Sequence, residues 1–385
     1  MYWVNTEERL PIKSWCKNVE PEAMAQAKNL ANLPFAFRHV ALMPDCHVGY
    51  GMPIGGVMAT RRAIVPNAVG VDIACGMIAV QTDCTRKIRS GTVKKVLGEV
   101  RQAIPVGFSH HDAPQEWSGF DEAPEIPIIQ RELNSARKQI GTLGGGNHFL
   151  EIQYGSDGHV WLMVHSGSRN FGYKIAKTYH EKAKDLCRRY YSDMPHLDLS
   201  FLPIESPEAK EYFIAMEYAM RFAKESRKMM MDKFCEAVSK HLKADFQLLT
   251  FDIHHNYARW ENHFGENVIV HRKGATSAKK GERGIIPGSQ GSGSYIVIGL
   301  GNPESFNSCS HGAGRIMGRN QARRTLDIAQ ETKLMEKQNI VHSIRGNRDL
   351  DEAPGAYKDI DEVMESQKDL VKIEVKLRPL GVIKG

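Results

Sequence analysis

The sequence predicts an α+β fold in which sheets and helices form a single large domain over residues 1–385. Short apolar runs typical of buried strands, such as residues 161–164 and 248–253, occur alongside long stretches with helical periodicity. No Pro/Ser-rich linker, charge block or low-complexity tract divides the chain. A hydrophobic content of 42% and a charged content of 25% are those of a globular protein with a sizeable core, which argues against disorder.

Three stretches have the composition or periodicity of helices. Residues 21–33 are rich in Ala, Glu, Gln and Lys and begin with Pro, which favours a first helical position. Residues 92–104 place their apolar side chains on one face, and Thr92 is the expected N-cap. Residues 206–238 are the longest such stretch, and a gap in their apolar spacing at Arg227 predicts a break.

Further strands are expected near residues 67–80, 295–300 and 371–377, and loops at residues 43–56 and 105–127. The loop at 43–56 contains four glycines together with Asp45 and His47. Asp45 is either a turn-capping residue or a carboxylate that orients a catalytic histidine.

A carboxylate and a thiol, Asp72 and Cys75, lie three residues apart in an apolar, glycine-containing run. Held together in a buried segment they repel each other and lose water, and a divalent cation offsets both costs. Several of the sixteen histidines follow short apolar runs, where strands end in loops. Any one of them alone favours a hydrogen-bonded structural histidine, but as a set with Asp72 and Cys75 they predict a metal site. The candidates are His148, His165, His254, His255 and His271.

Two other segments are suited to phosphate. Residues 285–294 are rich in glycine and serine and offer free backbone N–H groups, although they are not a P-loop. His311 lies between serine and glycine and is sterically open, as a nucleophile must be. Arg169, at the start of a helix expected over 173–190, is either an anion-binding residue or part of a structural ion pair.

Seven scattered cysteines indicate a reducing compartment, and the N-terminus lacks a secretory pattern, so a cytoplasmic protein without membrane spans is expected. The net charge of +6 is modest, but its excess is concentrated between residues 272 and 324. That cluster is either a solvated basic face or a surface for phosphate-bearing partners.

Seven ordered motifs resemble those of the RtcB family of GTP-dependent RNA ligases: residues 44–51, 69–77, 144–148, 165–169, 255–256, 287–289 and 310–315. The resemblance runs from about residue 10 to Lys384 and Gly385. It implies mixed or antiparallel β-sheets with surrounding helices and a metal site at strand ends. It also implies that two Mn²⁺ ions and GTP support the joining of an RNA 3′-phosphate, or a 2′,3′-cyclic phosphate, to a 5′-hydroxyl, through a histidine–GMP and then an RNA 3′-guanylylated intermediate.

The resemblance also implies roles for individual residues. Neighbours on a strand point to opposite faces, so only one of His254 and His255 can point inward, and the motif selects His255. The implied metal ligands are Asp72, Cys75, His148, His165 and His255, with Cys75 between both metals. His311 matches the guanylated histidine, and we nominate Asp45 to fix its tautomer. Guanylate-lining positions are Asn147, Phe149, Glu151, Ser289, Ala313, Gly314, Tyr357 and Lys384, and RNA-phosphate candidates are Arg169 and Arg315.

RNA with broken ends, from tRNA or ribosomal RNA, is the implied substrate in RNA repair or tRNA splicing. Asn170 stands where the family usually has Gly, which puts the RNA path in question. The sequence leaves open the oligomeric state and the need for an activating protein. Two other functions compete: a metal-dependent phosphodiesterase or phosphatase acting on RNA ends, and a non-catalytic RNA-binding protein.

Overall fold

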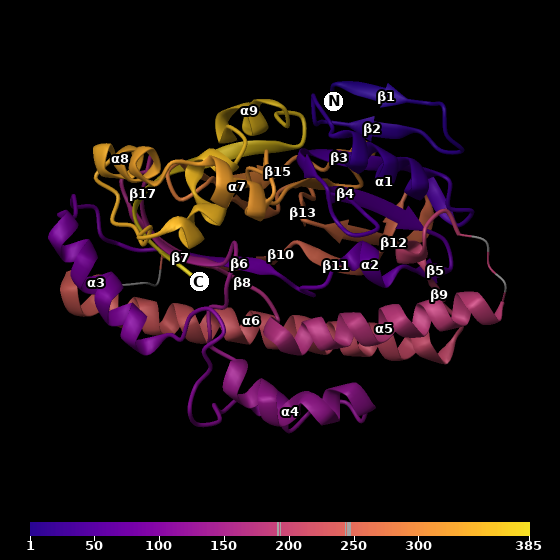
Figure 1. Cartoon of the computed structure of the whole chain (residues 1–385), viewed down its shortest axis with the longest axis horizontal. Coiled ribbons are helices and arrows are strands. Elements are labelled where there is room, and N and C mark those ends of the chain that lie inside the picture. Colours follow the sequence, from indigo (N-terminus) through magenta and orange to yellow (C-terminus); the bar gives the residue numbers. More distant parts are fainter. Residues whose placement is uncertain (191, 193, 243, 245–247) are drawn as a thin grey trace.

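The computed structural model describes residues 1–190, 192, 194–242, 244 and 248–385. Two large sheets lie at its centre, and helices cover them (Figure 1). The predicted α+β class with mixed and antiparallel sheets is confirmed. Among the described residues, no helix is long and apolar enough to cross a membrane.

The first sheet has six strands in the order β1-β2-β3-β4-β12-β11. All its pairings are antiparallel except that of β2 with β3. Helix α1 (Pro21–Ala31) covers it through Ala27 and Leu30, which are fully buried in a cluster with strand side chains. The strands are β1 (Trp3–Asn5), β2 (Ile12–Ser14), β3 (Ala36–His47), β4 (Ile54–Thr60), β12 (Glu266–Lys273) and β11 (Asn256–His263).

The second sheet has seven strands, all antiparallel, in the order β10-β6-β8-β7-β17-β15-β14. A large apolar cluster joins it to helices α3 (Ser90–Ala103) and α6 (Pro207–Leu242). The strands are β10 (Leu249–His254), β6 (Gly76–Gln81), β8 (Val160–Ser166), β7 (Phe149–Gly155), β17 (Val371–Lys384), β15 (Ser294–Gly299) and β14 (Arg283–Ile286).

Smaller elements complete the fold. Helices α5 (Arg169–Arg189) and α6 lie side by side along the sheets in Figure 1, and Tyr179 packs on Tyr212 between them. The other α-helices are α2 (Pro66–Val69), α4 (Pro127–Gln139), α7 (Arg319–Thr325), α8 (Ile328–Lys337) and α9 (Ile360–Glu365). Two-stranded sheets pair β13 (Ala275–Ser277) with β16 (Ser308–Ser310) and β5 (Ala63–Ile64) with β9 (Leu202–Pro203). The 3₁₀ turns are η1 (Ser118–Phe120), η2 (Leu197–Leu199), η3 (Pro303–Ser305), η4 (Asn347–Glu352) and η5 (Pro354–Ala356).

The expected break at Arg227 is wrong, because α6 runs through it without interruption. The Arg227 guanidinium is fully buried and binds both carboxylate oxygens of Asp252 at 2.7 Å. It also donates to the backbone oxygens of Ala74 and Ser166. A polar residue on the apolar face is therefore satisfied by partners from two neighbouring strands and a turn, and the helix does not need to end.

Two other expectations need correction. Residues 43–56 are not one loop, because β3 extends to His47 and β4 begins at Ile54, so that Asp45 lies on a strand. Helix α3 begins at Ser90 with Arg89 at its N-cap position, so Thr92 is inside the first turn and is not the cap. In both cases the polar and glycine residues suggested the end of a strand or helix, but the structure places them inside one.

Candidate functional site

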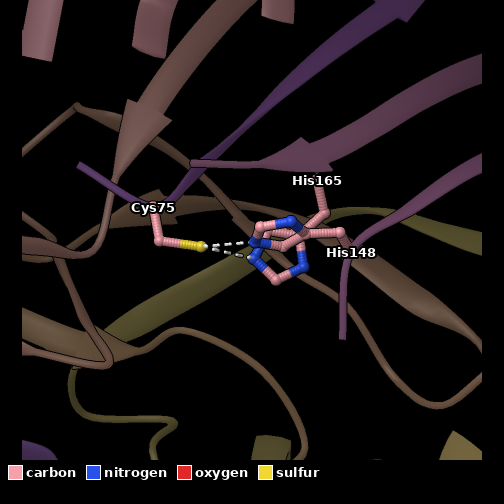
Figure 2. Close-up of side chains that lie close together, drawn as sticks. All are labelled: Cys75, His148 and His165. Atoms are coloured by element: carbon pink, nitrogen blue, oxygen red, sulfur yellow. Dashed lines mark hydrogen bonds between the residues drawn. The ribbon is translucent and has the colours of Figure 1, made fainter. Parts of the chain in front are cut away.

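Three buried side chains converge where strands of the second sheet begin or end. The Cys75 Sγ atom lies 3.4 Å from Nε2 of His148 and 3.3 Å from Nε2 of His165 (Figure 2). Cys75 directly precedes β6, His148 directly precedes β7, and His165 lies on β8 between these two strands. The pairing of β6 and β7 with β8 therefore sets the spacing of the three donors, whose ligand atoms all lie within 4.8 Å of one another.

Asp72 and His255 extend this cluster on its two sides. The Asp72 Oδ2 atom lies 3.1 Å from Nε2 of His148, and Nε2 of His255 lies 3.3 Å from Nε2 of His165. His254 points elsewhere, with its Nδ1 at 3.1 Å from the Arg227 guanidinium. The alternation of neighbouring residues thus brings His255, and not His254, to the cluster.

The backbone orients two of the imidazoles. Nδ1 of His148 lies 3.0 Å from the Leu143 carbonyl oxygen, and Nδ1 of His165 lies 3.1 Å from that of Asn147. A proton on each Nδ1 satisfies these carbonyls and leaves the Nε2 lone pairs directed at the Cys75 thiol. This is the usual arrangement behind metal-binding histidines. The glycines at 144 and 146 adopt positive φ, which lets the chain fold back tightly enough to present both carbonyls.

Burial sets the charge states of the cluster. It lowers the pKa of His165 and of His255 well below the usual value, so both imidazoles are neutral and able to bind metal. Burial likewise raises the pKa of the Cys75 thiol. Burial of Asp72 opposes its ionisation, but the contact with His148 and the nearby Arg169 guanidinium together outweigh this effect and hold the Asp72 pKa below its usual value. A divalent metal would supply the positive charge that a Cys75 thiolate needs, so the donor set fits such an ion.

His311 and Asp45 form a second polar pair beside the cluster. The Oδ2 atom of Asp45, which is fully buried, lies 2.6 Å from Nδ1 of His311 and also accepts the His311 backbone N–H at 3.1 Å. The His311 ring lies 4.8 Å from that of His255, measured between centroids. A Cβ at Gly314 would lie 2.3 Å from the Asp45 carbonyl oxygen, so only glycine allows this approach. Asp45 therefore orients His311 and does not cap a turn.

A small cavity of about 140 Å³ opens beside His311. This volume is below the roughly 300 Å³ of usual small-molecule sites, so it accommodates one part of a ligand, such as a base. All eight positions expected to line a guanylate border it, namely Asn147, Phe149, Glu151, Ser289, Ala313, Gly314, Tyr357 and Lys384. Its floor contains Glu151, whose pKa burial raises to about 8 and whose Oε1 atom has no hydrogen-bond partner among the described residues.

A much wider groove of about 1560 Å³ adjoins the small cavity, and His311, Asn147 and Lys384 line both. Asp72, Cys75 and His255 also line the groove, as do Arg169 and Arg315. A ligand whose base lies in the small cavity can therefore extend past His311 toward the metal-binding donors.

A family model described as tRNA-splicing ligase RtcB matches residues 26–126 and 112–385 of the chain. The chain belongs to the RtcB family. It is 38% identical to the RNA-splicing ligase RtcB of Escherichia coli K12 over 413 aligned residues, which cover the whole of both chains. The tRNA-splicing ligase RtcB of Thermococcus kodakarensis is 30% identical over 444 aligned residues, covering 96% of this chain and 92% of its own. The RNA-splicing ligase RtcB of Mycobacterium bovis is 32% identical, covering 94% of this chain and all of its own.

The two arginines that the RtcB resemblance implicates in RNA binding differ in their surroundings. Arg169 has positive φ, and its guanidinium lies 3.4 Å from Nδ1 of His148. Within the described chain it forms no ion pair. Arg315 pairs with Glu352 at 3.1 Å and lies over the Tyr357 ring. Its contact is thus with a carboxylate in this structure, and its RNA role stays a prediction.

The sequence did not reveal every polar residue of the site. Glu352 is 4% exposed and lies between Arg315, Arg319 and Lys384, whose charges outweigh its burial and hold its pKa below the usual value. It comes from a polar segment without apolar periodicity, so no sequence signal indicated its burial.

His271, in contrast, was a candidate ligand and does not reach the cluster. It is fully buried within β12, and its Nε2 atom accepts the Val65 backbone N–H at 3.0 Å. The apolar residues before it are part of the same strand, which continues to Lys273 and does not end at the histidine.

Proposed function

We propose that this protein is a GTP-dependent RNA ligase that joins an RNA 3′-phosphate, or a 2′,3′-cyclic phosphate opened first, to a 5′-hydroxyl. The observation that carries the proposal is the position of His311, between a base-sized cavity and a groove lined by metal-binding donors. A nucleotidyl-transfer enzyme needs a nucleophile at this junction, where the α-phosphate of a nucleotide bound in the cavity would lie.

Asp45 activates the nucleophile by fixing its tautomer. Its Oδ2 atom accepts the Nδ1 proton of His311, which leaves a lone pair on Nε2. Nε2 attacks the α-phosphorus of GTP, the bond to the β-phosphate oxygen breaks, and pyrophosphate leaves. An RNA 3′-phosphate oxygen then displaces His311 from that phosphorus. Finally a 5′-hydroxyl attacks the RNA phosphate, GMP leaves, and the two ends are joined.

Two Mn²⁺ ions, held by Asp72, Cys75, His148, His165 and His255 with Cys75 shared between them, would neutralise phosphate charge during these steps. The Cys75 sulfur lies near both His148 and His165, so it would be one of the residues that hold such ions. Mn²⁺ is a weak binder in the divalent series, so Zn²⁺ is expected to compete for these donors and inhibit.

Glu151 supports the choice of guanine over adenine. Guanine carries two neighbouring N–H donors on the edge where adenine has an acceptor, and a buried carboxyl with a free oxygen is a matching acceptor. Lys384 lies at the same cavity and 3.3 Å from the Asn147 carbonyl oxygen. Lys384 therefore lies where the cavity meets the groove.

Arg169 and Arg315 line the groove and are proposed to bind the RNA phosphates. Asn170 lines it next to Arg169 and is exposed, so its side chain is available to the RNA and does not obstruct the metal donors. We propose that the protein acts in the cytoplasm on broken tRNA or ribosomal RNA.

The test is incubation with Mn²⁺ and GTP labelled at the α-phosphate. We expect one acid-labile, alkali-stable phosphoramidate on His311, none on a His311→Ala variant, and normal labelling of a His196→Ala variant, whose imidazole is on the surface. The label should move to an RNA 3′-phosphate before the ends are joined. If the wild-type protein cleaves RNA phosphates without ever acquiring label, it is instead a metal-dependent phosphodiesterase or phosphatase in which water is the nucleophile.

A further inference from the structure

Phe108 is the most exposed large hydrophobic side chain among the described residues, and its ring has full solvent exposure. It lies in the connection between α3 and α4 and lines the wide groove. Two more exposed aromatic residues line the same groove, Tyr50 at 72% and Tyr173 at 43% exposure. Exposed aromatic rings gathered along one groove indicate a surface that binds a ligand.

The backbone holds Phe108 in a defined position. Ser109 donates its N–H to the Val106 carbonyl at 3.2 Å, which closes a turn with Phe108 at its tip. The turn is tied to the glycine run before His148, because Gly107 donates to the Gly144 carbonyl at 2.8 Å and Leu143 donates to that of Pro105 at 2.9 Å. The aromatic ring is therefore presented to solvent from a turn that is hydrogen-bonded to the glycine run before a metal-binding histidine.

The charges nearby suit a polyanion. Arg169 lies under this turn, with its guanidinium 3.5 Å from the Gly107 carbonyl oxygen. Lys273 also lines the groove and donates to the backbone carbonyls of Tyr50 and Asn67. Burial lowers the pKa of Lys273 to about 7 and its Nζ is already bonded to these carbonyls, so Arg169 is the cation that remains for a ligand. Arg169 has no carboxylate within 4.0 Å in the parts of the chain that the structure describes. A cation without an acidic partner beside exposed rings is the combination that binds single-stranded nucleic acid, with phosphate on the cation and bases on the rings.

We infer that Phe108 is a stacking platform for an unpaired base of the RNA strand whose end lies in the groove. This inference rests on the proposed function and makes its substrate more specific. A base inside a duplex already has neighbours on both faces and cannot stack on Phe108, so the protein prefers an RNA that is single-stranded at this position.

The experiment measures binding, which does not depend on joining. A fluorescent single-stranded RNA with a 3′-phosphate is titrated by anisotropy into the wild-type protein and into Phe108→Ala, Phe108→Trp and Tyr190→Ala variants. Tyr190 is 71% exposed and lies outside the groove, which makes it a matched control. We expect Phe108→Ala to weaken binding roughly tenfold, within the range for loss of one stacked base, and Phe108→Trp to restore it. Thermal unfolding should be unchanged, because the ring is fully exposed to solvent.

A second series locates the base. Abasic nucleotides are introduced one at a time along the RNA, and one position should weaken binding to the wild-type protein without further weakening binding to Phe108→Ala. The stacking role of Phe108 would be refuted if wild type and Phe108→Ala bound the RNA equally well. It would also be refuted if every abasic substitution weakened binding to Phe108→Ala as much as it weakens binding to the wild type. Absence of His311 labelling in the wild-type protein would instead overturn the ligase proposal, so the two failures are distinguishable.

Discussion

The Asp45–His311 pair gives the sharpest test of the chemistry, through an Asp45→Asn variant. Asp45 Oδ2 accepts two N–H groups, the backbone N–H of His311 and its Nδ1–H. An amide at this position has one oxygen and one NH₂ group. If the NH₂ group faces Nδ1, the imidazole must carry its proton on Nε2, and the nucleophilic lone pair is lost.

The size of the effect follows from that geometry. In the Ser-His-Asp triad the same carboxylate-to-amide change lowers kcat about 10⁴-fold because the histidine adopts the wrong tautomer. Here the histidine is itself the nucleophile, its contact with Asp45 is 2.6 Å, and Asp45 is fully buried. We therefore expect the rate of His311 labelling to fall by about 10³- to 10⁴-fold, equivalent to about 4–5 kcal/mol of activation free energy.

The assay is the initial rate of label transfer from GTP in the absence of RNA. A Glu99→Gln variant is the control, because Glu99 also accepts from a histidine, His241 at 3.1 Å, but on the surface of α3. Its labelling rate should match that of the wild type. Labelling by Asp45→Asn within tenfold of the wild-type rate would show that His311 does not depend on this carboxylate for its tautomer.

Two further predictions concern the cluster and the cavity. Cys75→Ala should reduce Mn²⁺ bound per chain, measured by elemental analysis after equilibrium dialysis, and abolish labelling while the fold persists; unchanged stoichiometry would contradict the ligand set. Burial raises the pKa of Glu151 to about 8, so it is protonated below that pH and ionised above it. Since the ionised form is the better acceptor for guanine N–H groups, the KM for GTP should fall as pH rises from 6.5 to 8.5. Glu151→Gln should abolish this pH dependence of the KM and reduce the preference for GTP over ATP. If the KM of this variant still fell as pH rises, another group would be responsible for the pH dependence.

Three separate signals in the sequence indicated the cluster. Cys75 was indicated by its spacing from Asp72, and His148 by the glycine run before it. His165 follows the apolar run that forms β8, which indicates the edge of a sheet. The same reasoning failed for His271, because a strand that continues past a histidine has the same local pattern as one that ends there.

Local sequence patterns do not predict the burial of a residue whose partners lie far away in the chain. Arg227 interrupts an apolar face in the sequence, and only its pairing with Asp252 explains an unbroken helix. Helix α4 was not anticipated either, since its residues are mostly polar and its apolar side chains pack on α5. Glu352 is buried by Arg315 and Lys384, which come from other segments.

The site joins two halves that come from different sheets. Asp45 lies on β3 of the first sheet, whereas His165 lies on β8 of the second and Cys75 directly precedes β6 of that sheet. Between β10 of the second sheet and β11 of the first, the chain passes from one sheet to the other through a single residue, His255. Its ring contacts both halves, with His165 on one side and His311 on the other.

Asn256 fixes this crossing. Its side chain donates to the Asp72 carbonyl at 3.0 Å and accepts the Gly274 N–H at 2.8 Å, and its own carbonyl accepts the Ala74 N–H. These bonds tie the turn that carries Asp72 and Cys75 to the end of β12. The residue after the histidine is therefore a positioning residue, which holds the metal-binding donors in register with the nucleophile. The pairing of His255 with Asn256 in the sequence thus has a physical basis: one side chain reaches both halves of the site, and the next keeps those halves together.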